Sequence, residues 1–215
     1  MDDTDWDRVA GDYYGAILSP LTNSDFNPLF SDLRHLGGNA IDLGCGIGPL
    51  LPILSEQFSH VTALDFSKEM VEQARKNNLM LPNVSYVQAD MKDLRIRKRF
   101  DVAVAVNSIL APDVKEVNSM LKQAHKILKP GGTLLAVLPA MEIYLYQAML
   151  IVDENKDDLK KARKKAAAQV NPDEHDLLLG TITFDGDTQK CFYRFEIPHL
   201  LEKAGFKDID KVLYS

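Results

Sequence analysis

The sequence predicts an α/β fold in which a doubly wound, mostly parallel sheet is covered by helices on both faces. Short apolar runs alternate along the chain with segments of helical periodicity. Residues 100–106 are nearly continuous Val and Ala, as expected of a strand that is buried on both faces. A glycine-rich turn also follows the first apolar run and leads into a helical segment.

The first elements support this fold in order. Residues 5–30 are expected to form two helices broken around Pro20 and Asn23, because proline ends a helix. A helix over residues 69–78 has Ser67 as its predicted cap. Strands are expected at residues 40–43, 61–64, 84–87, 100–106 and 133–138, and further helices at 49–58 and 113–128.

The alternation lapses after Leu138, and we expect an insertion there. Residues 141–169 are predicted to form a long helical stretch whose second half is a charged, solvated face. Residues 177–184 and 189–195 flank an Asp-Gly turn signal at Asp185, which favours a hairpin. A helix at 196–204 and a strand at 206–213 complete the predicted fold.

The 215 residues are expected to form one domain, because no segment is long enough to serve as a linker. Its predicted parts are an N-terminal helical cap at residues 1–37, a ligand-binding core at 38–138, the insertion at 139–190 and the C-terminal part of the core at 191–215.

Composition excludes several classes of function. The 25 Lys and Arg against 31 Asp and Glu give a net charge of −6, which disfavours nucleic acid as a partner. The 2 cysteines and the acidic start favour a reducing, cytoplasmic setting over a secreted one. The most apolar stretch, residues 134–152, is interrupted by Pro139 and Glu142, so no membrane span is expected.

The turn after the first strand carries glycine at alternate positions, Gly44, Gly46 and Gly48. Glycine permits a tight turn and a close ligand, and the amides at the start of the next helix attract an anion. The dinucleotide pattern G-x-G-x-x-G is not matched, because Pro49 stands at the third glycine position. A nucleotide-like ligand is therefore one interpretation, and a simple helix-capping turn is the other.

Polar side chains follow the next three predicted strands. Asp65 ends the second strand about 20 positions after Gly44, where a carboxylate can accept both ribose hydroxyls of an adenosine. Asp90 follows the third strand and Asn107 the fourth. The carboxyl ends of parallel strands lie at one edge of a sheet, so these residues are expected to share a crevice. Each carboxylate taken singly is also explained as a helix cap.

Together these segments resemble the class I S-adenosylmethionine-dependent methyltransferases, of the type that acts on small molecules. Residues 42–48 (DLGCGIG) are similar to the first motif of that family, and residues 64–67 (LDFS) to its ribose-binding strand. Residues 88–91 (QADM) are similar to its adenine-binding turn, and residues 128–134 (LKPGGTL) to the entry of its fifth strand. The resemblance implies a Rossmann-like fold with S-adenosyl-L-methionine as the cofactor.

The resemblance also implies roles for individual residues. Gly44 to Gly46 would lie under the methionine part of the cofactor, and Asp65 would hold the ribose. Asp90 would accept from the adenine amino group, and Asn107 would face the sulfonium. Tyr13 is similar in position to a tyrosine that closes over the cofactor, although packing on the core explains it equally. The full expected cofactor set is Tyr13, Asp42, Gly44, Cys45, Gly46, Asp65, Phe66, Met70, Ala89, Asp90, Met91 and Asn107, with Met70 and Met91 flanking the adenine.

One departure from the family pattern concerns its seventh strand, since the chain ends at Ser215. We expect one of three explanations: the chain is truncated, the hairpin near Asp185 substitutes, or a second subunit covers the exposed sheet edge in a homodimer.

Methyl transfer from a sulfonium is a direct displacement and needs no nucleophilic residue, only alignment of the acceptor. Acceptors that lose a proton also need a general base, for which the sequence offers several candidates without ranking them. The weak catalytic candidates are Tyr13, Tyr14 and His175, with His35 and Glu142 beside them.

Some acceptor classes are disfavoured by the residues present. Asn107 is followed by Ser-Ile-Leu rather than by the Pro-Pro-Tyr of enzymes that methylate adenine or glutamine nitrogen. Cys45 and Cys191 are not expected to act as nucleophiles, and no cluster of carboxylates predicts a metal. A small-molecule acceptor is expected. The alternatives are a nicotinamide-dependent oxidoreductase on a similar fold and a non-catalytic module that binds the cofactor.

Overall fold

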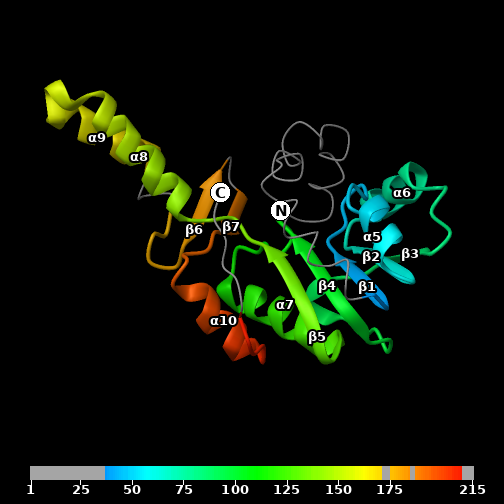
Figure 1. Cartoon of the computed structure of the whole chain (residues 1–215). Helices are drawn as coiled ribbons and strands as arrows, with labels where there is room; N and C mark the ends of the chain where they lie inside the picture. Colours follow the sequence, from blue (N-terminus) through cyan, green and yellow to red (C-terminus); the bar gives the residue numbers. More distant parts are fainter. Residues whose placement is uncertain (1–36, 171–174, 185–186, 210–215) are drawn as a thin grey trace. The chain divides into compact units, whose positions relative to one another are not determined.

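The computed structural model describes residues 37–170, 175–184 and 187–209 (Figure 1). The described chain divides into two compact units. The core unit comprises residues 37–109 and 119–137, and the second unit comprises residues 110–118 and 138–209.

The core unit contains a parallel five-stranded sheet of order β3-β2-β1-β4-β5. Connections run in one direction from β1 to β3 and in the other from β4 to β5, so the strand order reverses between β1 and β4. This confirms the predicted doubly wound, Rossmann-like fold. The strands are β1 (Asn39–Leu43), β2 (His60–Asp65), β3 (Val84–Gln88), β4 (Phe100–Val106) and β5 (Leu128–Val137).

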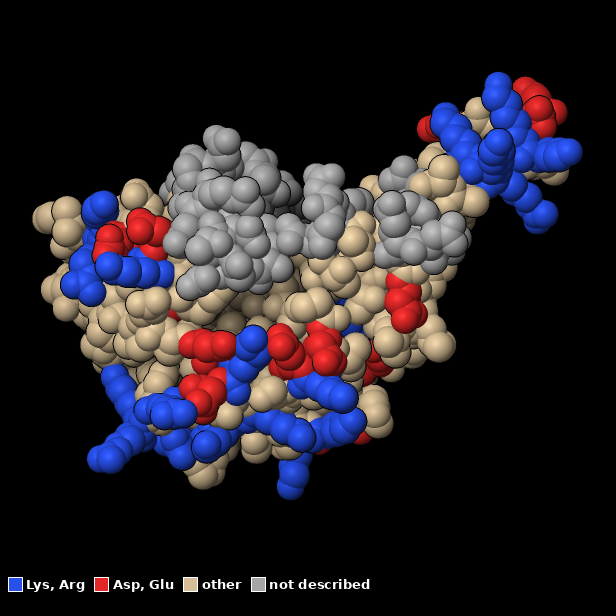
Figure 2. Space-filling view, turned by 180° about the vertical axis from the view of Figure 1, so that it is seen from behind, with Lys and Arg blue, Asp and Glu red and all other residues tan. Residues whose placement is uncertain are grey.

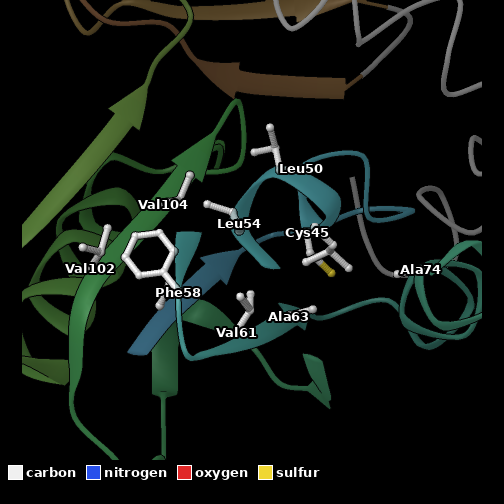
Figure 3. Packing of buried hydrophobic residues seen from close by; sticks show 11 residues of the cluster. Cys45, Leu50, Leu54, Phe58, Val61, Ala63, Ala74, Val102 and Val104 are labelled. Atoms are coloured by element: carbon white, nitrogen blue, oxygen red, sulfur yellow. The ribbon is translucent and has the colours of Figure 1, made fainter. Parts of the chain in front are cut away.

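The helices of this unit follow the predicted periodicity. Leu51 and Leu54 of α5 are fully buried, and they pack with apolar side chains of β2 and β4 in the core (Figure 3). Ser67 caps α6 as predicted, because its Oγ accepts from the amide of Met70 at 3.1 Å. The helices are α5 (Leu51–Gln57), α6 (Lys68–Asn77), the short 3₁₀ turn η2 (Met91–Asp93) and α7 (Val114–Ile127), which spans both units.

Strand β5 begins earlier than the sequence predicts. The glycine-containing segment expected to precede it, residues 129–132, lies inside the strand. The pairing with β4 shifts register between Phe100 and Val102, and Gly131 adopts φ 77°. A bulge of this kind accommodates turn-forming residues within a strand.

The second unit contains the expected helices and hairpin, but the hairpin strands cover only residues 181–184 and 187–190 rather than the predicted 177–184 and 189–195. The long helical stretch is interrupted at Asn155, so two helices form a helical hairpin (Figure 1). The Lys and Arg side chains of α9 are exposed on it, as predicted for a solvated face (Figure 2). The elements are α8 (Glu142–Glu154), η3 (Lys156–Asp158), α9 (Leu159–Val170), β6 (Thr181–Phe184), β7 (Asp187–Lys190) and α10 (Glu196–Ala204), with β6 and β7 antiparallel.

One predicted element is wrong where it can be checked. Residues 206–209, expected to begin a strand, follow α10 without forming one. The predicted N-terminal helices and the Asp185-Gly186 turn lie outside the described residues. Within the described part of the chain, no helix is long and apolar enough to cross a membrane.

Candidate functional site

The glycine-rich turn joins β1 to α5 at the carboxyl end of the sheet. Gly44, Gly46 and Gly48 all have positive φ, of 73°, 53° and 80°. The amides of Gly44 and Cys45 both donate to the carbonyl of Leu64, at 2.7 and 2.9 Å. The turn therefore lies against the end of β2. This arrangement requires residues that tolerate a positive φ, as glycine does.

Two asparagines at the end of α6 form hydrogen bonds to the second half of this turn. Asn77 Nδ2 donates to the carbonyl of Ile47 at 3.0 Å. Asn78 Nδ2 donates to the carbonyl of Gly48 at 3.1 Å, and a Cβ added to Gly48 would lie 2.6 Å from the same nitrogen. The sequence did not predict a role for either residue, because Asn is common at the end of a helix, where it serves only to terminate it.

Ser108 encloses the turn from the side of β4. Its Oγ donates to the carbonyl of Leu43 at 2.6 Å. A Cβ added to Gly44 would lie 2.4 Å from the Cβ of Ser108, a distance that real Cβ atoms do not adopt. Glycine at position 44 is thus required by both its backbone conformation and its neighbour.

Asp65 links the end of β2 to the turn. Its Oδ2 accepts from the amide of Gly46 at 2.9 Å, and its Oδ1 accepts from the amide of Ser67 at 3.0 Å. The carboxylate is 6% exposed. Backbone N–H donors stabilise the charged form of a carboxylate, so this side chain is held in one position as an anionic acceptor.

Asp42 lies near Asp65, on β1, in a different environment. It is 2% exposed, and among the described residues its Oδ2 has no hydrogen-bond partner. Burial, and then the charge of Asp65, raise the pKa of this carboxyl from 3.8 to about 7. Burial also raises the pKa of the Cys45 thiol well above its usual value, so Cys45 is a neutral packing residue rather than a nucleophile.

The structure brings the other predicted core residues to the same sheet edge. The amide of Ala89 donates to the carbonyl of Asp65 at 2.9 Å, which joins the end of β3 to that of β2. Asp90 is exposed and its Oδ1 accepts from the amide of Lys92 at 2.8 Å. Asn107 has φ 48° and follows β4 directly. Phe66 follows Asp65 and is half-buried, whereas Met70 and Met91 are buried.

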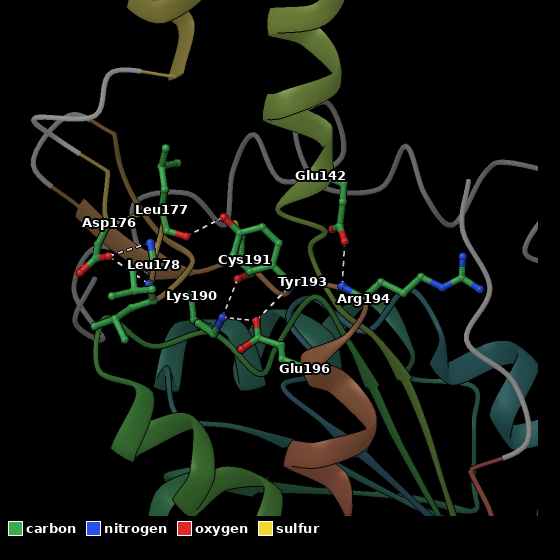
Figure 4. Close-up of polar contacts among 10 residues, drawn as sticks. Glu142, Asp176, Leu177, Leu178, Lys190, Cys191, Tyr193, Arg194 and Glu196 are labelled. Carbon is green, nitrogen blue, oxygen red and sulfur yellow. Dashed lines mark hydrogen bonds and ion pairs between the residues drawn. The ribbon is translucent and has the colours of Figure 1, made fainter.

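None of the general-base candidates lies among the described residues of the core unit. Tyr13, Tyr14 and His35 lie outside the described residues. His175 belongs to the second unit, where it is buried and its Nδ1 accepts from the amide of Thr183 at 3.2 Å. Glu142 belongs to the same unit and accepts from the amide of Arg194 at 2.8 Å (Figure 4). Their catalytic roles stay predictions.

A buried lysine in the second unit was not singled out from the sequence. Lys190 is fully buried, and its Nζ contacts Glu196 Oε1 and donates to the carbonyl of Cys191 at 2.8 Å (Figure 4). The ammonium also lies 5.0 Å from the centre of the Phe192 ring. Glu196 Oε1 accepts in addition from the amide of Tyr193 at 2.8 Å. This ion pair joins β7 to the start of α10.

We expect Glu196→Gln to lower the free energy of unfolding by about 1–3 kcal/mol, because the amide keeps an acceptor but leaves a buried ammonium without its counter-charge. Urea denaturation at pH 7 measures the effect. Glu142→Gln is the matched control, since Glu142 accepts from a backbone amide but pairs with no buried lysine in the described structure. Equal losses in the two variants would contradict the assigned role of the ion pair.

Within the described ranges, no group of 3 or more His, Cys, Asp or Glu side chains could hold a metal ion.

Comparisons with known proteins place this site in a family. Residues 40–132 match the family model of a methyltransferase domain. A demethylmenaquinone methyltransferase of Staphylococcus epidermidis is 33% identical over 99 residues, which are 45% of this chain and 41% of the relative. A trans-aconitate 2-methyltransferase of Acidovorax sp. (strain JS42) is 28% identical over 196 residues, which are 81% of this chain and 69% of the relative.

Coverage differs among the relatives. The chain spans less than half the length of several of them, including 45% of a malonyl-[acyl-carrier protein] O-methyltransferase of Priestia megaterium that is 26% identical over 126 residues and 58% of this chain. A solved structure described as the DhpI-SAM-HEP complex has a TM-score of 0.58 at 19% identity, covers 94% of this chain and 86% of its own, and shows the fold. Residues 40–132 thus match a methyltransferase domain, and the chain is similar to class I S-adenosylmethionine-dependent methyltransferases that act on small molecules.

Proposed function

We propose that the chain transfers a methyl group from S-adenosyl-L-methionine to a small-molecule acceptor by direct displacement. The observation that carries the proposal is the bond between the turn and the carboxylate beside it. The amide of Gly46 donates to Asp65 at 2.9 Å, so the glycine turn and a fixed anionic acceptor form one structure. The turn and the Asp65 carboxylate lie where strand order reverses. This position suits the binding of an adenosine that carries a polar substituent.

The residues present fit this cofactor. Gly44 and Gly46 have positive φ and carry no side chain of their own, and the buried Asp42 Oδ2 is an acceptor without a partner among the described residues. We assign Gly44, Cys45 and Gly46, with Asp42, to its amino-acid part. Asp65 is assigned to the ribose, Asp90, Met70 and Met91 with Phe66 and Ala89 to the adenine, and Asn107 to the sulfonium side.

The bound cofactor supplies an activated methyl group, and the protein supplies placement. Alignment of donor and acceptor alone is worth roughly 7–11 kcal/mol of the barrier. Asp65 is suited to hold the cofactor in place. Two backbone amides fix the position of its carboxylate, and α6 begins shortly after it in the chain, at Lys68. Tyr13, Tyr14 and His175 stay proposed as groups that remove a proton where the acceptor requires it.

The acceptor is proposed as a class only. The relatives above are named for different acceptors, among them demethylmenaquinone and trans-aconitate, so their names favour small molecules without selecting one. Residues 139–190 are proposed as the acceptor-binding insertion, within one functional domain of residues 1–215 that also includes the cap at 1–37.

Calorimetry with S-adenosylhomocysteine and with NADH tests the proposal. We expect micromolar binding of the first and none of the second, followed by transfer of a labelled methyl group to one member of an acceptor panel. Binding of NADH alone would favour the oxidoreductase alternative. Cofactor binding without transfer to any acceptor would favour a non-catalytic module.

We expect Asp65→Ala to weaken binding of S-adenosylhomocysteine by about 1–3 kcal/mol, because it removes a charge-assisted acceptor. Isothermal calorimetry measures the change, and circular dichroism checks the fold. Glu72→Ala is the control, since Glu72 is exposed on α6 and pairs with Lys68 at the surface. Unchanged affinity in Asp65→Ala would count against the assigned ribose contact.

We also propose a homodimer through the sheet edge. Among the described residues β5 pairs with β4 alone within the sheet, and we propose that a strand of a second copy pairs with its other edge. Light scattering coupled to size-exclusion chromatography measures the mass, and a monomer at micromolar concentration would contradict this proposal.

A further inference from the structure

The two carboxyl groups of the site differ sharply in their surroundings. Asp65 accepts from two backbone amides, at 2.9 and 3.0 Å. Asp42 has an Oδ2 that no described residue contacts by a hydrogen bond, although the side chain is almost completely buried. A buried charge without a partner is costly, so one of the two groups is stabilised as an anion and the other is not.

The groups around Asp42 favour its neutral form. Asp65, from β2, brings a negative charge close to it, and the Cys45 thiol of the turn is itself neutral. In the sheet, Asp42 is paired in register with Ala63 of β2 and with Val104 of β4, which bring no charge. These contacts agree with the raised pKa of Asp42, about 7, because burial and Asp65 both act against its ionisation.

A cationic ligand reverses this balance. The proposed cofactor carries an ammonium group in its amino-acid part, and an ammonium next to a buried carboxyl stabilises the carboxylate. We propose that binding of the amino-acid part of the cofactor at the turn expels one proton from the Asp42 carboxyl, which makes cofactor affinity rise with pH between pH 6 and pH 8. The O–H bond of the carboxyl breaks, the proton passes to solvent, and the carboxylate pairs with the ammonium. This inference rests on the proposed cofactor site.

Linkage sets the expected size of the effect. With the free carboxyl half-protonated near pH 7, binding releases about 0.9 proton at pH 6 and about 0.1 proton at pH 8. The dissociation constant for S-adenosylhomocysteine is then about tenfold higher at pH 6 than at pH 8. The ammonium and carboxylate of this ligand keep their charges over that range, so the change belongs to the protein.

Calorimetry of the whole chain tests the proposal with two probes. S-adenosylhomocysteine is titrated at pH 6, 7 and 8 in phosphate and in imidazole buffers, whose different ionisation enthalpies report the number of protons released. 5′-Methylthioadenosine has the same adenine and ribose but no amino-acid part. We expect proton release with the first ligand and none with the second. This comparison uses the unmodified protein and does not depend on any variant folding.

Two variants identify the group. Asp42→Asn cannot titrate, and we expect it to bind S-adenosylhomocysteine with no proton release and with an affinity that is constant from pH 6 to pH 8. Glu72→Gln, a charge-removing change on the exposed face of α6, is expected to leave the release unchanged.

Each outcome has a distinct meaning. Binding without proton release at pH 6, release that persists in Asp42→Asn, or equal release with 5′-methylthioadenosine would overturn the inference and leave the proposed function standing. Absence of S-adenosylhomocysteine binding at every pH would overturn the proposed function, and the inference with it.

Discussion

Gly44→Ala is expected to lower the free energy of unfolding by about 2–5 kcal/mol and to abolish measurable binding of S-adenosylhomocysteine. A left-handed backbone costs a non-glycine residue about 1–2 kcal/mol, and an overpacked contact costs about 1–3 kcal/mol more. Both costs apply, because φ is 73° and the new Cβ would lie 2.4 Å from the Cβ of Ser108. Relief of the contact would displace the turn whose amides bond to Leu64.

Gly131→Ala separates the two costs. Gly131 has φ 77°, nearly that of Gly44, but a Cβ there meets nothing within 4 Å. We expect a loss of about 1–2 kcal/mol from the backbone conformation alone, with cofactor binding retained. Ser108→Gly in the Gly44→Ala background is expected to restore part of the stability. Urea denaturation and calorimetry measure both, and equal losses at positions 44 and 131 would show that the contact with Ser108 has no effect.

The parallel sheet could be predicted from the sequence because its strands are buried on both faces. A run such as Phe100–Val106 has no competing interpretation, and its neighbours repeat the same alternation. The insertion was predicted less accurately, since the break at Asn155 carries neither Gly nor Pro. The strand expected from residue 206 followed from an apolar pattern alone, and residues 206–209 show that such a pattern does not guarantee pairing.

The candidate site was predictable where topology determines it. Asp65 ends β2, whereas Ala89 follows β3 and Asn107 follows β4, so their shared edge follows from the parallel sheet. The hydrogen bonds from Asn77 and Asn78 to the turn were not predictable, because they depend on where the end of α6 meets the turn. The same applies to the buried Lys190, whose partner is fixed by tertiary packing rather than by sequence spacing.

Asp42→Asn is expected to change the pH dependence of stability in the ligand-free protein. The pKa of Asp42 is about 7 in the folded chain and near 3.8 when unfolded, so between these values the folded state holds a proton that the unfolded state has lost. The free energy of unfolding therefore falls as pH rises through this window and levels off above it. Relative to the wild type, Asp42→Asn gains about 3 kcal/mol between pH 5 and pH 8.5.

Asp101→Asn is the matched control for this gain. Hydrogen bonds from the amide of Asn39 and from Lys129 lower the pKa of Asp101, so its carboxyl stays ionised in both states above pH 5. We expect its difference from the wild type to be the same at pH 5 and pH 8.5. Urea denaturation of the three proteins at both values measures the contrast. A difference between wild type and Asp42→Asn that does not vary with pH would mean that Asp42 is already charged in the ligand-free fold, and that the turn holds two carboxylates without a proton.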